Sequence, residues 1–148
     1  MGRHRSKTAA TWIALVGGGL GLHRFYLAGV RDWWGWMYPA PTLLGSLGVL
    51  RAREFGVDDR LSWLLIPLLG FALAAAMLSA IVYGLTSDDR WHLRHNPHEA
   101  APRRSGWLAV IGVVLALMIG ASVLMATIAF SGQRFFEYEV ERGRKISR

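Results

Sequence analysis

The sequence predicts an all-α integral membrane protein, a helical bundle with about four transmembrane helices. Of its 148 residues, 53% are hydrophobic and only 18% are charged. The apolar residues are gathered into long uncharged blocks, whereas a soluble chain would scatter them at helical spacing between polar faces. Most of the seven tryptophans lie within a turn of the ends of these blocks. That position is typical of an aromatic belt at a membrane surface.

The first element is a helix that follows the basic segment 1–7. The uncharged block 8–22 has 15 residues, which give about 22 Å of helix against a hydrocarbon core of about 30 Å. Two interpretations fit this length: a short, tilted span, or a helix that continues by a turn or two beyond His23. Continuation is preferred, with Arg24 snorkelling and Tyr26 at the level of the headgroups.

Three further blocks are long enough to span a bilayer. Block 33–50 has the length, but Pro39 and Pro41 are expected to bend or break its helix. Blocks 61–85 and 106–130 have 25 residues each and are predicted to cross with some tilt. The predicted organisation is therefore a hairpin over 8–50, followed by two more transmembrane helices within 51–130.

Polar segments connect the predicted helices: a link over 51–60, a loop over 86–105 and a charged tail over 131–148. Four spans would place both termini on one side of the membrane. That side, with the 51–60 link, would hold 11 of the 17 basic residues. The positive-inside rule then predicts cytoplasmic termini.

Small residues recur at four-residue spacing in the apolar blocks, which lets membrane helices approach closely. Internal packing of the bundle is the preferred interpretation. An outward-facing stripe, which would form a docking surface, is the alternative. The residues are Gly17, Gly21, Ala72, Ala76, Ala80, Gly84, Gly112, Ala116 and Gly120.

The histidines His92, His95 and His98 recur every three residues in the 86–105 loop. Three imidazoles can bind zinc. Pro97, however, interrupts any helix that would align them, and Arg94 adds repulsion, so a solvated loop is preferred. The sequence shows no nucleophile and base at catalytic spacing, and we expect neither an enzyme nor a cofactor.

The net charge of +7 comes mainly from arginines that flank the hydrophobic blocks and form no continuous basic face. Anionic lipid headgroups are therefore expected as their partners, and nucleic acid is not. In the tail, apolar and acidic residues alternate from Phe136 onward, which fits a strand that adds to a partner's sheet. A helical extension fits equally well. In both cases Phe135, Phe136 and Tyr138 offer apolar contacts beside the membrane.

Residues 7–50 resemble a known family. Lys7, the glycine-rich helix through Gly21, and the run His23-Arg24-Phe25-Tyr26-Leu27 resemble the TM2 domain, with Ala28 in place of the usual glycine. The resemblance implies a two-helix membrane module without a defined catalytic activity. The arginine-rich, lysine-poor composition favours the inner membrane of a bacterium.

The predicted function is a non-catalytic accessory or assembly subunit that packs against other integral membrane proteins. His23, Arg24, Tyr26 and Arg31 would anchor the helix turn to headgroup phosphates or to a partner's carboxylate. Two alternatives remain: a small transporter or channel, which needs ionisable groups inside the bundle, and a metal-dependent membrane enzyme that uses the three histidines.

Overall fold

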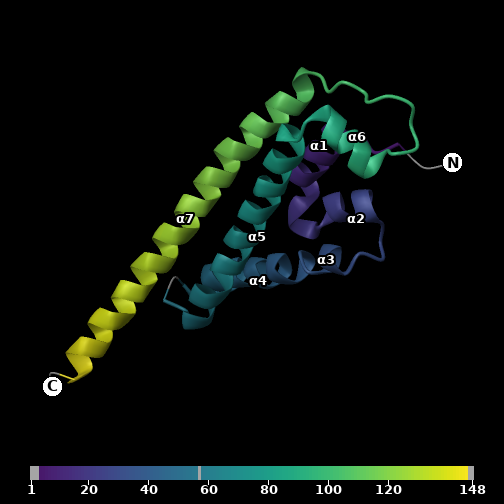
Figure 1. Ribbon diagram of the computed structural model, residues 1–148. Coiled ribbons are helices and arrows are strands. Elements are labelled where there is room, and N and C mark those ends of the chain that lie inside the picture. The colour runs from purple at the N-terminus through teal and green to yellow at the C-terminus, as the bar shows by residue number, and fades with distance from the viewer. Residues whose placement is uncertain (1–3, 57, 147–148) are drawn as a thin grey trace.

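A computed structural model describes residues 4–56 and 58–146, and every regular element in this part of the chain is helical (Figure 1). The all-α prediction is confirmed. The elements are α1 (Lys7–Gly17), the short 3₁₀ helix η1 (Gly18–Leu20), α2 (Leu22–Ala28), α3 (Trp33–Trp36), α4 (Pro39–Phe55), α5 (Arg60–Leu85), α6 (Asp88–His95) and α7 (Trp107–Ile146).

Two helices, α5 and α7, are long and apolar enough to cross a membrane. They have 26 and 40 residues, and the most apolar stretches have mean hydropathies of 2.4 and 2.7. The predicted small residues on these helices are mostly buried: Ala72, Ala76 and Ala80 on α5, and Gly112, Ala116 and Gly120 on α7. They face the interior, where α5, α7 and α1 meet.

Helix α4 packs along the first half of α5 in antiparallel order. Gly45 lies against Leu69, Gly48 lies against Leu65, and the Arg51 guanidinium pairs with Asp59 at 3.0 Å. Asp59 also accepts hydrogen bonds from the backbone and the hydroxyl of Ser62, so it caps the first turn of α5. The bond with Arg51 and those with Ser62 lower the pKa of Asp59.

Helix α1 packs along the second half of α5, also in antiparallel order. Its first residue, Lys7, donates to the carbonyl of Thr86 at 2.8 Å, and the turn after its end places Gly18 against Ala76. At 11 residues, α1 is about 16 Å long, roughly half of a hydrocarbon core.

Helices α1 and α4 therefore lie one after the other along α5, and together they extend over its length once. The excursion 18–38, which contains α2 and α3, separates them. We predicted a continuous helix past His23 and a second span over 33–50, and the structure contains neither. The first helix ends at Gly17 because a glycine-rich turn follows it, and α4 begins only at Pro39, where proline suits the first helical position.

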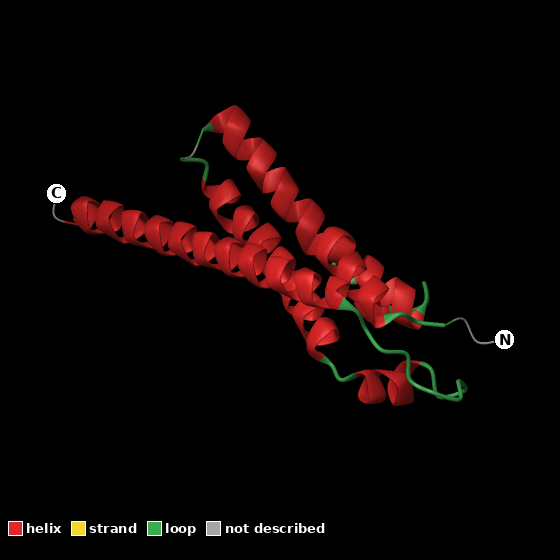
Figure 2. Ribbon diagram, turned by 90° about the horizontal axis from the view of Figure 1, so that it is seen from above, coloured by secondary structure: helices red, strands yellow, loops and turns green. Residues whose placement is uncertain are grey.

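The two ends of the described chain lie at opposite ends of α5. Lys7 lies beside Thr86, whereas Arg134 packs over the ring of Trp63 in the first turn of α5. Figures 1 and 2 show the same separation of the N- and C-terminal ends. If α5 crosses the membrane, this arrangement would place the two ends on opposite sides of it. The expected shared, cytoplasmic side of the termini stays a prediction.

A salt bridge fixes the start of α1 to the start of α6. The Lys7 ammonium lies 2.7 Å from Asp88, and Ser105 also donates to this carboxylate. Burial by itself raises the pKa of Asp88, but the hydrogen bonds from Lys7 and Ser105 outweigh burial and lower the pKa to about 2. The charged carboxylate is therefore the form that the folded protein favours.

Replacing Asp88 by asparagine is expected to cost about 1 kcal/mol of stability at neutral pH. Because folding lowers its pKa, Asp88 contributes fully above an unfolded pKa of about 4, and its contribution is lost as the pH falls to about 2. Thermal unfolding of both proteins in detergent at pH 7 and pH 2 measures this difference. The exposed neighbour Asp89 serves as a control, since Asp89→Asn removes an equal charge. An Asp88→Asn deficit that persists at pH 2 would contradict the assignment.

Candidate functional site

The turn after η1 carries the residues that the sequence singled out, and its geometry depends on Gly21. This residue has a φ of 74°, in the left-handed region that favours glycine. A Cβ at Gly21 would also clash with the carbonyl oxygen of Gly35. The turn directs α2 back along α1, so that the Tyr26 hydroxyl accepts a hydrogen bond from the Ser6 backbone at 3.0 Å.

His23 is fully buried at this turn. Its ring lies between Tyr38 and Tyr83, with ring centroids 5.0 and 5.8 Å away. Within the described part of the chain, neither ring nitrogen has a hydrogen-bond partner. The ring cannot reach a headgroup, and the predicted anchoring role of His23 is wrong because the fold encloses it. Tyr26 likewise contacts the chain's own N-terminal segment.

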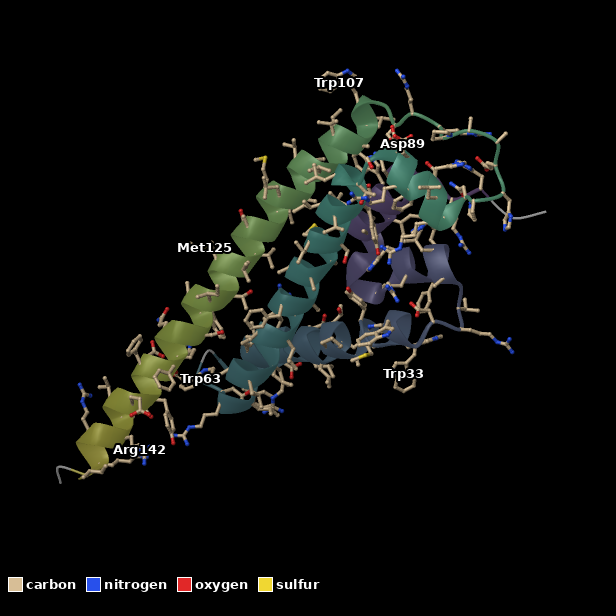
Figure 3. The ribbon with its side chains drawn as sticks, in the orientation of Figure 1. Trp33, Trp63, Asp89, Trp107, Met125 and Arg142 are labelled. Atoms are coloured by element: carbon tan, nitrogen blue, oxygen red, sulfur yellow. The ribbon has the colours of Figure 1, made fainter. Side chains whose placement is uncertain are left out.

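Arg24 and Arg31 remain accessible. Arg24 forms a two-pronged salt bridge with Asp32, with N–O distances of 2.8 and 3.2 Å. This pair fastens the first turn of α2 to Asp32, the residue before α3, whose first residue Trp33 projects outward (Figure 3). Arg31 is exposed in the loop before α3. Of the four predicted anchor residues, the structure thus buries His23, leaves Tyr26 and Arg24 half-buried, and leaves Arg31 exposed.

A cavity of about 630 Å³ lies beside Arg24, between α2, the end of α5, and α6. Four arginines line it: Arg5, Arg24, Arg90 and Arg94. No carboxylate is among its lining residues. This cluster could not be predicted from the sequence because its members come from three distant segments. The four-residue spacing of Arg90 and Arg94, which places them on one helix face, was the available signal.

The three predicted histidines do not converge. His92 and His95 lie on α6, where the His95 ring packs on Trp91 at 4.2 Å, and His98 follows the helix and is exposed. Burial and then the charges of Arg5 and Arg94 lower the pKa of His95. No group of three His, Asp or Glu residues in the described ranges is arranged to hold a metal ion.

The tail, for which the sequence allowed either a strand or a helix, is helical. Helix α7 continues to Ile146, well beyond its apolar stretch. Arg134 lies over the ring of Trp63, which holds the start of the tail against α5. Within α7, Arg134 also lies near the ring of Phe130 and pairs with Glu137 at 2.6 Å. The predicted contact residues Phe135, Phe136 and Tyr138 are 60, 69 and 42% exposed.

Among known proteins, no family model, no curated protein and no solved structure matches this chain. The resemblance of residues 7–50 to the TM2 domain therefore stays a prediction.

Proposed function

We propose that this chain is a non-catalytic integral membrane protein that acts as an accessory or assembly subunit of a larger membrane complex. The exposed aromatic residues on the tail of α7 carry this proposal. Lipid tails can cover the exposed apolar side chains of α5 and α7, as they do for other membrane spans. Phe135, Phe136 and Tyr138 follow the apolar stretch of α7, on a part of the helix that also bears charges, and remain 60, 69 and 42% exposed.

The geometry of the tail supports a protein partner. Residues 131–146 add about 24 Å of helix beyond the apolar stretch. Arg134 over the ring of Trp63 and the ion pair of Glu141 with Arg60 attach one side of this segment to the start of α5. Val140 and Ile146 are more than half exposed. Aromatic side chains on a rigid, mostly uncovered helix are the kind of anchor that fills a partner's pocket.

The sequence supports the remaining parts of the proposal. Small residues on α5 and α7 face the interior. The tail is therefore the expected contact with a partner protein, and anionic lipid headgroups are the expected partners of the exposed arginines. The TM2-like motif at Gly21–Leu27 supports a non-catalytic membrane module, and 15 arginines among 17 basic residues support a bacterial inner membrane.

A photoreactive amino acid at position 136 tests the subunit role in intact membranes. We expect it to form one adduct of defined mass with another integral membrane protein, because this ring is exposed beyond the lipid-covered stretch. Position 93 is the control, since Leu93 is 72% exposed on α6 and carries no predicted contact. Adducts at position 136 only with lipid, or only with a second copy of the chain, would contradict the proposal.

A further inference from the structure

The cavity differs from an ordinary charged surface because three of its four arginines have no carboxylate partner in the described part of the chain. The fourth, Arg24, pairs with the Asp32 carboxylate. The side chains of Arg5, Arg90 and Arg94 make no hydrogen bond or ion pair within the described ranges. Three uncompensated guanidinium groups around one cavity repel one another and favour a multiply charged anion.

The shape and lining of the cavity indicate what kind of anion fits. Guanidinium groups bind phosphate oxygens through paired, charge-assisted hydrogen bonds. Leu27, Ala28 and Val82 form an apolar part of the wall. Val82 is 53% exposed, and the neighbouring Leu85 is 70% exposed, so the apolar surface continues outward from the cavity. A ligand with phosphate at one end and hydrocarbon at the other meets both surfaces.

The position along α5 places this cavity at a membrane boundary. Thr86 caps the end of the apolar helix, and the polar helix α6, which supplies Arg90 and Arg94, begins at Asp88. Phosphate groups of a bilayer lie just outside the hydrocarbon core, at the depth that such a helix end occupies. Basic pockets in this position recognise anionic headgroups.

We propose that this cavity binds the phosphodiester groups of an anionic phospholipid, with Arg5, Arg90 and Arg94 as the phosphate ligands and Leu27 and Val82 along the acyl chains. The inference deepens the lipid contact in the proposed function by assigning it a site. Lipid binding is measured on the isolated chain, whereas the subunit role is measured by cross-linking in membranes. Failure of the lipid site is therefore distinguishable from failure of the subunit role.

Native mass spectrometry of the purified chain in a neutral detergent tests the site. The probes are cardiolipin, which carries two phosphodiesters, phosphatidylcholine, which carries phosphate without net charge, and inorganic phosphate. We expect one cardiolipin per chain and much weaker binding of phosphatidylcholine. The variant Arg90→Gln/Arg94→Gln is expected to bind cardiolipin about tenfold more weakly or worse, since it removes two charge-assisted contacts.

The matched control is Arg103→Gln/Arg104→Gln, which removes two equally exposed charges from the adjoining loop outside this cavity. It should bind cardiolipin as the natural chain does. Equal weakening in both variants would overturn the site, because general surface attraction then explains the binding. Competition by inorganic phosphate at the same concentration as the lipid would overturn phospholipid as the source of the phosphate. The Arg90 and Arg94 side chains make no hydrogen bond or ion pair among the described residues. A loss of binding with an unchanged helical circular dichroism spectrum therefore cannot be assigned to unfolding.

Discussion

Replacing Gly45 by alanine is expected to lower the stability of the protein by about 2–3 kcal/mol. At this position α4 approaches α5 so closely that a Cβ would stand 2.5 Å from the Cβ and 2.7 Å from the Cα of Leu69. These atoms belong to the helix backbone or are attached directly to it, so no rotation of a side chain can relieve the clash. The two helices would have to separate, and the contact of Gly48 with Leu65 one turn later would loosen with them.

Without the clash, the substitution would stabilise the helix, because alanine is intrinsically a better helix former than glycine by about 1 kcal/mol. A loss of stability would therefore report the close packing of α4 on α5. Gly132→Ala on α7 is the matched control, since no atom lies within 4 Å of a Cβ built there. Thermal unfolding in detergent should show a large loss for Gly45→Ala and a small gain for Gly132→Ala. If both substitutions stabilise the protein, α4 does not pack on α5 as described.

The long helices were the most predictable part of the fold. Uncharged length is a local property of a sequence, and blocks 61–85 and 106–130 lie within α5 and, apart from the first residue, α7. The continuation of α7 into the tail was less predictable. Alternating apolar and acidic residues fit both a strand and a helix, and the contacts of Arg134 with Trp63 and Glu137 favour the helix.

The number of crossings over 8–50 could not be read from length and composition. Where α1 ends depends on contacts between segments far apart in the sequence. The Thr42 hydroxyl donates to the carbonyl of Gly19 at 2.6 Å, and Gly21 packs against Gly35. The glycine run and the prolines were visible as breaks, but nothing local shows that the two halves align along one helix.

The candidate site could also be predicted only in part from the sequence. The motif around His23 and Arg24 indicated the correct turn, but its two ionisable side chains lie in different surroundings. His23 is enclosed by Tyr38 and Tyr83, whereas Arg24 opens onto a cavity. The other arginines of that cavity come from the N-terminal segment and α6, so only the folded chain brings them together.

We expect α1 and α4 together to make one crossing beside α5 and α7, which would place the two ends of the chain on opposite sides of the membrane. A four-span bundle would instead place the N-terminal end on the same side as the C-terminal end, and would leave the sides of the other segments unchanged. The exposed loop at Arg103 and the exposed positions Glu54 and Arg142 lie on opposite sides in both arrangements. The residue that distinguishes them is His4, which contacts Glu99 in the same loop as Arg103.

Single cysteines at positions 4, 54, 103 and 142 provide this test without a background, because the chain contains no cysteine. Sealed membrane vesicles of known orientation are treated with a thiol reagent that cannot cross the bilayer. We expect His4→Cys to react together with Arg103→Cys, and Glu54→Cys and Arg142→Cys to react only from the other side. Reaction of His4→Cys together with Arg142→Cys, or of all four from one side, would contradict the account.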